Sequence, residues 1–273
     1  MKPDPATGNG GEQKNLMMPV VQDRKAQICA LLKSIETGEP EPIAVFNQQQ
    51  YIQHNPHTQE GSEGLEELFK RLSQTSPRVN IVRAFEDGDY VFAHTEYDFV
   101  RSNIGFGVFR FENDHVVEHW DNIQPRQDPN ISGLTLVEGP SEATDHNLTE
   151  TNRQTVSAFV ETVLVRRQFA QLEDHFEGSE LIQHNPQLSN GVKAFRAALE
   201  ERNGAGFTIE YTRLHRVLAE GNFVLSVSEG SRNDVHSSFY DLFRLSKGKL
   251  AEHWGTIEDI PPHSAWKNDN GKF

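Results

Sequence analysis

Cysteine is nearly absent from this chain, and so are long apolar runs. The single Cys29 among 273 residues excludes an internal disulfide and a zinc site built from several cysteines. No apolar stretch approaches the roughly 18 residues that a membrane-spanning helix needs. The opening MKPDPATGNGGEQKN is polar and has no apolar core of the kind that a signal peptide carries. We therefore expect a cytoplasmic protein that makes no use of a membrane.

Positive charge is also scarce. The 26 Lys and Arg residues are outnumbered by 40 Asp and Glu residues, which gives a formal net charge of −14. Nucleic acids and anionic membranes bind basic surfaces, so we expect neither as a partner. Apolar residues make up only 36% of the chain, which is low for a chain that is globular throughout. Part of it is therefore expected to be tail or linker.

Signatures of metal and cofactor sites are missing as well. The chain has 12 histidines but no HxH or HExxH spacing, so we expect no bound metal. No Gly-rich phosphate loop and no constellation around a Ser or Cys nucleophile stands out. Any chemistry is then expected to rely on side chains alone, without a cofactor.

What the sequence does contain is an internal repeat. The segment YIQHNP at Tyr51 returns as LIQHNP at Leu181, an offset of 130, and VFRFENDHVVEHW at Val108 returns as LFRLSKGKLAEHW at Leu242, an offset of 134. This period is too long for a solenoid and indicates a duplicated domain. We expect disordered tails at 1–20 and 263–273, domains at 21–125 and 149–262, and a Pro/Gly-rich linker at 126–148.

Both copies show the same order of predicted elements. An amphipathic helix comes first, at 23–38 and at 149–168 with Thr149 as the expected N-cap, and a short helix then ends near Phe46 or Phe176. The QHNP turn and a third helix follow. Strands rich in Val, Phe and Tyr are then expected in copy one at 79–86, 90–100, 105–112 and 115–123. Helices followed by a run of strands predict the α+β class, with helices on one face of an antiparallel curled sheet.

The combination of QHNP, a following glycine and helix, and a late EHW resembles the SnoaL-like branch of the NTF2-like superfamily. That branch includes polyketide cyclases and the related ketosteroid isomerases. The resemblance covers roughly residues 21–125 and 149–260. It implies two tandem cone-shaped α+β barrels, each with a pocket between the curved sheet and its helices. It also implies that the two copies pair through their sheets as an intramolecular pseudo-dimer, with a homodimer of the whole chain as the alternative.

The last hairpin of copy two carries a candidate catalytic acid. A three-residue loop at 246–248, with glycine in the left-handed third position, is a favoured hairpin connection. It predicts that Asp241 lies directly opposite His253, on a face that is otherwise mostly apolar. A two-residue loop would instead place Trp254 opposite Asp241, so the prediction depends on the length of the loop.

In copy one the same register places His119 opposite Gly107. Asp121 follows His119 by two residues and therefore shares its face. Gly107 aligns with Asp241, and Asp121 aligns with Gly255. Each copy has thus lost one acid of a pair and kept the other, so we expect a histidine–carboxylate pair in both copies, built from different acids.

Such a pair suits the removal of a proton next to a carbonyl group. A carboxylate in an apolar pocket has a raised pKa, which brings it closer to the working pH of a general base. A neighbouring histidine can orient the acid, share its proton or donate a hydrogen bond to the developing enolate. We expect the catalytic residues to be His119, Asp121, Asp241 and His253. The alternative for each acid is a solvated carboxylate near a strand end or one held by a single arginine.

The repeated motifs add candidate residues for binding a substrate: Gln53, His54, His94, Trp120, Gln183, His184 and Trp254. Each also has a structural interpretation. The histidines of QHNP could bond to nearby backbone, and the tryptophans of EHW could pack between the sheets while Glu118 and Glu252 pair with arginine. His94 shares a face with Glu96 and Asp98, which indicates either a polar pocket wall or a solvated face.

The leading hypothesis is a SnoaL-like protein that binds a small hydrophobic organic molecule. It would catalyse an aldol condensation, a cyclisation or an isomerisation by acid/base chemistry, without a cofactor. The first alternative is a non-catalytic binding or scaffold protein, because related folds serve many functions. The second is one catalytic copy with a degenerate copy as its built-in partner.

Overall fold

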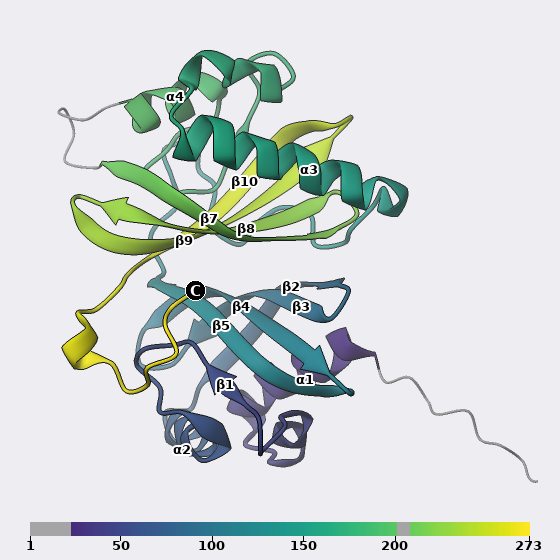
Figure 1. Cartoon of the computed structure of the whole chain (residues 1–273), viewed down its shortest axis with the longest axis vertical. Helices are drawn as coiled ribbons and strands as arrows, with labels where there is room; N and C mark the ends of the chain where they lie inside the picture. Colours follow the sequence, from purple (N-terminus) through teal and green to yellow (C-terminus); the bar gives the residue numbers. More distant parts are fainter. Residues whose placement is uncertain (1–22, 201–207) are drawn as a thin grey trace, which may run out of the picture.

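The computed structural model describes residues 23–200 and 208–273. The expected disordered tail at 1–20 lies outside these residues. Within them the predicted fold class is confirmed, because the chain forms two α+β units in tandem (Figure 1). We call residues 23–125 half one and residues 149–262 half two.

Half one places its helices before its long strands, as its sequence pattern predicts. Asp23 caps the first helix by accepting a hydrogen bond from the backbone N–H of Ala26, and Gly38 ends it with φ of 73°. The elements are α1 (Arg24–Thr37), a 3-10 turn (Glu41–Val45), β1 (Ile52–Gln53), α2 (Gly61–Ser73), β2 (Arg78–Asp87), β3 (Tyr90–Asp98), β4 (Ser102–Glu112) and β5 (His115–Pro125).

Half two repeats this order. Its first helix is α3 (Thr149–Phe159), which continues as a π-helical turn (Val160–Val165) and is followed by two 3-10 turns. Thr149 is not the N-cap as we expected: its hydroxyl donates to the carbonyl of His146 and accepts from the N–H of Gly221. The remaining elements are β6 (Ile182–Gln183), α4 (Val192–Glu200), β7 (Ile209–Glu220), β8 (Phe223–Arg232), β9 (Val235–Ser246) and β10 (Lys249–Asp259).

Each sheet is mixed rather than purely antiparallel. The strand orders are β1-β5-β4-β3-β2 and β6-β10-β9-β8-β7, and the two-residue strands β1 and β6 run parallel to β5 and β10. The Ile-Gln of each QHNP motif is this edge strand, and only the residues after it turn. The motif therefore lies beside EHW, with Gln53 paired to His119 and Gln183 paired to His253.

The register of the late hairpins differs from both registers considered above. Lys247 and Gly248 form a two-residue turn with φ of 52° and 74°, as in a type I′ turn. A β-bulge between Leu250 and Glu252 then adds a residue, so Asp241 faces Gly255. The predicted and observed partners differ by two positions. An even shift keeps every side chain on its predicted face, so Asp241 and His253 still share one.

The two sheets pack face to face across a shared apolar layer, with the helices on the outside (Figure 1). Two arginines repeat one contact across this layer: Arg83 lies 4.3 Å above the ring of Trp254, and Arg216 lies 3.8 Å above the ring of Trp120. The layer is formed by Phe85, Phe92, Phe106, Val108, Trp120, Leu218, Phe223, Leu225, Val227, Tyr240, Leu242 and Trp254.

The linker between the halves reaches over half two. Asn130 donates from its amide to the carbonyl of Gln183, and the carbonyl of Thr135 lies 2.7 Å from Nδ1 of His184. Both contacts fall on the second QHNP motif. The linker thus leaves the last strand of half one and caps backbone and side-chain groups of half two.

The chain after Pro262 was expected to be disordered, and the structure shows that this expectation is wrong. This segment crosses to half one (Figure 1) and repeats what the linker does. Asn270 donates to the carbonyl of Gln53 at 3.0 Å, and the carbonyl of Gly271 lies 2.8 Å from Nδ1 of His54. Its polar composition indicated disorder, but its amides pair with backbone groups of the first QHNP motif. The segment that follows each half therefore caps the other half. The linker follows half one and caps half two, and residues 263–273, which we call the C-terminal arm, follow half two and cap half one.

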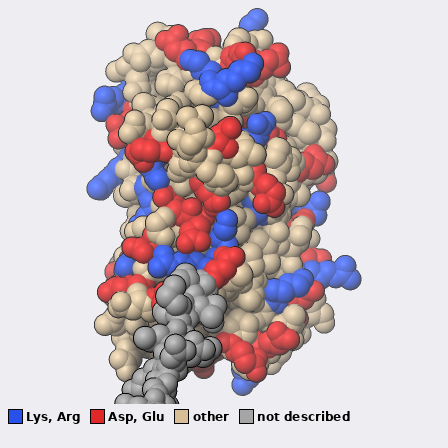
Figure 2. Space-filling model, turned by 90° about the vertical axis from the view of Figure 1, so that its right-hand side faces the viewer, with Lys and Arg blue, Asp and Glu red and all other residues tan. Residues whose placement is uncertain are grey.

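The surface carries charges of both signs. On the face shown in Figure 2, basic side chains are interspersed with acidic ones over both halves, and do not gather into one patch among the described residues. No helix in residues 23–200 and 208–273 is both long enough and apolar enough to span a membrane.

Candidate functional site

Half one contains a cavity of about 200 Å³ between its helices and the curved sheet. Helices α1 and α2 supply most of its apolar wall and also Arg71, whereas the other polar groups come from the sheet and from the turn after β1. It is lined by Leu31, Leu32, Ile35, Phe46, Gln53, Asn55, His57, Thr58, Leu65, Leu68, Phe69, Arg71, Leu72, Tyr97, Phe99, Phe109, His119, Asp121 and Ile123. His119 and Asp121, the two candidate catalytic residues of half one, both line this cavity.

Two glycines on β4 help to keep this space open. Gly105 and Gly107 align with Phe239 and Asp241 of half two. A Cβ added to Gly107 would lie 3.0 Å from the ring of Phe109, and one added to Gly105 would lie 2.9 Å from the side chain of Ile123. The half-two side chains therefore do not fit here without rearrangement. Half one keeps a hollow where half two places an aromatic ring and a carboxylate.

His119 is held in one tautomer by Gln53. The Oε1 atom of Gln53 accepts the backbone N–H of Asn55 at 2.9 Å, so it is an acceptor, and His119 donates to it from Nδ1 at 3.2 Å. The other ring nitrogen, Nε2, has no hydrogen-bond partner among the described residues. Burial lowers the pKa of His119 to about 4, against the opposing effect of Asp121. The imidazole is thus neutral at pH 7, with a lone pair free on Nε2.

Asp121 is oriented by residues other than His119. Asn55 donates from its amide to Oδ2 at 2.8 Å, while Oδ1 lies 3.7 Å from the ammonium of Lys272 and accepts no hydrogen bond from the described residues. The expected pairing of His119 with Asp121 is not a hydrogen bond in this structure. Asp121 lies opposite Gly107 on the neighbouring strand. The two groups share a wall of the cavity without bonding to each other.

Tyr97 is a lining residue that the sequence analysis missed. Burial raises its pKa, and the charge of Asp121 raises it further, so the phenol stays protonated and can donate a hydrogen bond. It lies on β3, opposite Val79. The alternation of side chains along β3 could have placed it on the inner face, but nothing in the repeat singles it out: its counterpart in half two is Gly230.

The corresponding acid of half two is fully bonded. His253 Nε2 lies 2.9 Å from Oδ1 of Asp241, and the hydroxyl of Tyr211 donates to Oδ2 at 3.0 Å. Nδ1 of His253 donates to Gln183 at 3.0 Å, in the same arrangement as in half one. The expected histidine–carboxylate pair is therefore present here, with each of its polar atoms committed to a protein partner.

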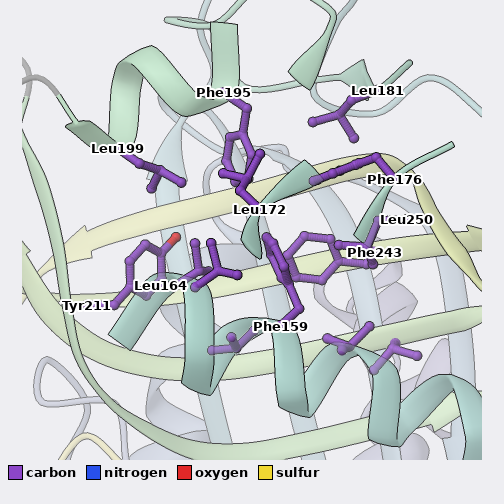
Figure 3. Close-up of a cluster of buried hydrophobic side chains, with 14 of the residues drawn as sticks. Phe159, Leu164, Leu172, Phe176, Leu181, Phe195, Leu199, Tyr211, Phe243 and Leu250 are labelled. Atoms are coloured by element: carbon purple, nitrogen blue, oxygen red, sulfur yellow. The ribbon is translucent and has the colours of Figure 1, made fainter. Parts of the chain in front are cut away.

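Large apolar side chains fill the interior of half two (Figure 3), and two of their rings lie against His253. The rings of Phe243 and Phe195 lie 4.8 Å and 5.7 Å from that of His253. The cluster includes Phe159, Leu164, Leu172, Phe176, Leu181, Phe195, Leu199, Tyr211, Phe243 and Leu250. Asp241 and His253 thus lie in a packed core, where half one has a cavity.

The QHNP histidine and the EHW motif form a structural unit in each half. In half one, His54 stacks on Trp120 at 4.6 Å and bonds through Nε2 to Glu118, which Arg110 holds from its other oxygen. Half two repeats each of these contacts with His184, Trp254, Glu252 and Arg244. Neither histidine and neither tryptophan lines the cavity of half one, and their contacts are those of this structural unit.

His94 is also placed elsewhere than expected. It is buried between the sheets, where its ring stacks on Phe106 at 4.2 Å and its Nδ1 lies 3.3 Å from the guanidinium of Arg83. Burial lowers the pKa of His94 well below its usual value, and the charge of Arg83 lowers it further. Farther along β3, Asp98 is exposed to solvent and Glu96 forms an ion pair with Arg126.

The neutral state of His119 predicts an acid-dependent loss of stability. Its pKa in the folded state, about 4, is below the unfolded value near 6.5, so the unfolded chain binds the proton first as the pH falls. The free energy of unfolding should then decrease from about pH 6.5 to pH 4, by up to about 3 kcal/mol from this residue. Urea denaturation at several pH values should show a shallower decrease for His119→Gln than for the wild type. Parallel profiles would contradict a His119 that is neutral in the folded state.

Another concave region, over the helices of half one, contains none of the predicted site residues. A wider surface groove of about 460 Å³ lies over α1, the first 3-10 turn and α2, and is lined by residues such as Glu39, Gln48 and Lys70. In the described parts of the chain, no group of three or more His, Cys, Asp and Glu side chains could hold a metal ion.

Comparison with known proteins gives structural neighbours only. No family model and no curated protein matches the chain. TsrD from Streptomyces laurentii is 20% identical, with a TM-score of 0.34, over 37% of this chain and 90% of its own. IdmH from Streptomyces antibioticus, provisionally assigned as a polyketide cyclase, is 14% identical, with a TM-score of 0.33, over 36% of this chain and 90% of its own.

A protein from Kribbella flavida that is provisionally assigned as a ketosteroid isomerase is 12% identical, with a TM-score of 0.35, over 42% of this chain and 84% of its own. The three matches span between 36% and 42% of this chain. The neighbours are polyketide cyclase-like and NTF2-like or ketosteroid isomerase-like proteins. At these identities and TM-scores, the likeness assigns no activity to this chain.

Proposed function

We propose that half one binds a small apolar organic molecule and catalyses proton transfer next to its carbonyl group, while half two acts as a built-in structural partner. The observation that carries this proposal is the cavity of half one. It has an apolar helical wall, and its sheet wall holds the carboxylate of Asp121 and the uncommitted Nε2 of His119. Half two aligns with half one but has its acid bonded inside a packed core.

In the proposed reaction, Asp121 removes a proton from the carbon next to the carbonyl group of the ligand. The electron pair of that C–H bond moves to the carbonyl oxygen, where Tyr97 donates a hydrogen bond to the developing negative charge. In an unsaturated ketone, the conjugated enolate then regains the proton from Asp121 at another carbon, which is an isomerisation. Where the ligand carries a second carbonyl group, the enolate carbon attacks it instead, and the oxygen of that group takes the proton from Asp121, which is an aldol cyclisation. His119 accepts a hydrogen bond from a ligand hydroxyl through Nε2.

The apolar wall supports this chemistry in two ways. It holds the ligand through buried apolar surface, and it excludes water, which strengthens the electrostatic interactions of Asp121 and Tyr97 inside the cavity. The volume of about 200 Å³ is below the range of drug-sized pockets, roughly 300–1,000 Å³. The ligand is therefore expected to be small, with one or two rings.

The ketone 2-indanone tests the proposal, because its α-protons exchange with solvent once a base removes them. We expect the protein to accelerate hydrogen–deuterium exchange of 2-indanone in D2O, measured by proton NMR, and to be stabilised by the ketone in a thermal-shift assay. Neither effect in the wild type, with 2-indanone or a panel of related cyclic ketones, would reject the proposal.

A substitution that fills the cavity tests whether 2-indanone binds there. Leu65 lines the cavity and aligns with Phe195 of half two. We expect Leu65→Phe to remove most of the thermal shift produced by 2-indanone while leaving the protein folded, since half two accommodates the same residue. The matched control is Phe195→Leu, which should lower the melting temperature but leave the ketone-induced shift unchanged. An unchanged shift in Leu65→Phe would place binding elsewhere.

The second candidate is a binding protein without catalysis. The specific observation in its favour is that His119 and Asp121 bond to Gln53 and Asn55 and not to each other, so the expected histidine–carboxylate pair is not formed in half one. The same experiment separates the candidates: a thermal shift with no accelerated exchange would assign binding alone to half one.

A further inference from the structure

The exchanged C-terminal arm brings a buried cation to the outer side of Asp121. The side chain of Lys272 is 2% exposed. Its ammonium donates to the backbone carbonyl of Asp121 at 2.9 Å and to Oε2 of Glu258 at 2.7 Å, and lies 3.7 Å from Oδ1 of Asp121. Lys272 does not line the cavity, so it contacts Asp121 from behind.

This contact joins two acids and one cation in a buried cluster. Glu258 comes from β10 of half two and also accepts the N–H of Ile123 at 3.0 Å. Burial raises the pKa of Glu258, while Lys272 lowers it and Asp121 raises it. Without the ammonium, two carboxylates would share a poorly hydrated space, and like charges there favour protonation of one of them. Oδ1 of Asp121 accepts no hydrogen bond from the described residues, and its ion-pair partner is the ammonium of Lys272 at 3.7 Å.

We propose that Lys272 is a positioning residue that keeps Asp121 ionised and directed into the cavity, so that the C-terminal arm completes the site of half one. The role of Asp121 as the base is taken from the proposed function. The charge state that Lys272 imposes can be measured without any turnover.

The arm is anchored on both sides of Lys272. Asn268 donates to the carbonyl of Asn55 at 2.7 Å, and Asn55 is the residue that donates to Oδ2 of Asp121. Beyond Lys272, Phe273 stacks on His215 of half two at 4.2 Å. The arm therefore fixes Asp121 through two routes, directly through Lys272 and through the backbone of Asn55.

The arrangement is specific to half one. The linker, which caps half two in the way that the arm caps half one, contains no lysine between residues 126 and 148. Half two also has Gly255 at the position of Asp121. Among the described residues, the one buried lysine thus lies on the side of the molecule where an acid lines a cavity.

Other ionisable groups also surround Asp121 and enter the interpretation of a titration. His119 shares β5, Tyr51 precedes β1 and Tyr97 lies on β3, while Tyr240 and Glu258 approach from half two. The pKa values of the three tyrosines are raised, with burial as the largest cause, so they remain neutral below pH 9. Among these neighbours, Glu258 and His119 are therefore the groups whose charges can change together with that of Asp121. The ionisable side chains of His57 and Arg71 also line the cavity.

The test is a carbon-13 NMR titration of the Asp121 carboxyl, assigned by its absence in Asp121→Asn. We expect Lys272→Met to raise the midpoint of Asp121 by about one pH unit or more, since an opposite charge at this distance typically shifts a carboxyl pKa by that amount. Lys272→Arg should restore most of the shift. Lys267→Met is the matched control on the same arm, because Lys267 is exposed, and it should leave the midpoint unchanged.

A second variant keeps the test valid where Lys272→Met does not fold. Glu258→Gln removes the competing carboxylate but keeps acceptors for Lys272 and Ile123, and it should lower the midpoint of Asp121. An unmoved midpoint in Lys272→Met, or in Glu258→Gln where that variant alone folds, overturns the proposal. A shifted titration midpoint of Asp121, in a protein that neither binds 2-indanone nor accelerates its hydrogen–deuterium exchange, supports the role of Lys272 and rejects the proposed function instead. Where the protein does accelerate the exchange of 2-indanone, the pH at which the exchange rate falls on the acid side should rise together with the midpoint of Asp121.

Discussion

Asp121→Asn is expected to slow the exchange of 2-indanone by two to four orders of magnitude, which is the usual contribution of a positioned general base. The amide has nearly the shape of the carboxylate, so the cavity and its apolar wall should persist. It cannot accept a proton from carbon, because its basicity is far lower. The loss should therefore appear in the exchange rate measured by NMR, while the thermal shift produced by the ketone is largely retained.

The duplicated chain supplies a control for this variant. Asp241→Asn makes the same chemical change on the aligned hairpin of half two, where the acid bonds to His253 and Tyr211 inside the core. It should lower the melting temperature and leave the exchange rate per folded molecule unchanged. Equal loss of exchange in both variants, or full exchange in Asp121→Asn, would contradict the assignment of catalysis to half one.

The architecture could be predicted because it depends on local patterns that occur twice. Helical periodicity, alternating strands and a period near 130 residues were sufficient for two tandem α+β units. The shared face of Asp241 and His253 also followed from alternation alone, and it survived an error in register because the error was even. The error itself arose from Lys247, whose positive φ allowed a two-residue turn, and from a bulge that no sequence signal marked.

The strongest repeated signal had a structural explanation. QHNP and EHW recur because both halves need the same unit, in which a histidine stacks on a tryptophan and bonds to a glutamate held by an arginine. The features specific to half one lie where the copies differ. Asp121 faces Gly107 in half one, whereas Asp241 faces Gly255 in half two, so the acid occupies opposite sides of one cross-strand pair.

The cavity and its supporting cation could not be predicted, since both depend on contacts between distant segments. A hollow is set by the summed volumes of side chains from four or more elements, and the sequence fixes those neighbours only after folding. Lys272 follows Asp121 by 151 residues and reaches it through an arm whose composition indicated disorder. In that arm, Asn268 and Asn270 donate hydrogen bonds to backbone carbonyls of half one, and amino-acid composition does not reveal such pairing.

The acid of half two is expected to matter for stability. Asp241→Leu should lower the free energy of unfolding by about 3–5 kcal/mol, the usual cost of removing one partner from a buried pair. The loss has two sources, because His253 and Tyr211 both keep polar atoms that no longer have a partner in the core. Urea denaturation, monitored by the fluorescence of the buried tryptophans, measures this loss.

The double variant Asp241→Leu/His253→Phe distinguishes a stability role from general sensitivity of the core. Replacing both members of a buried pair by apolar residues of similar volume costs much less than breaking the pair, so the double variant should be more stable than Asp241→Leu alone. The rings of Phe195 and Phe243 already lie against His253, and a phenylalanine there meets apolar neighbours. Losses that simply add would show that the pair contributes no coupling, and half two would then need another explanation for keeping its acid.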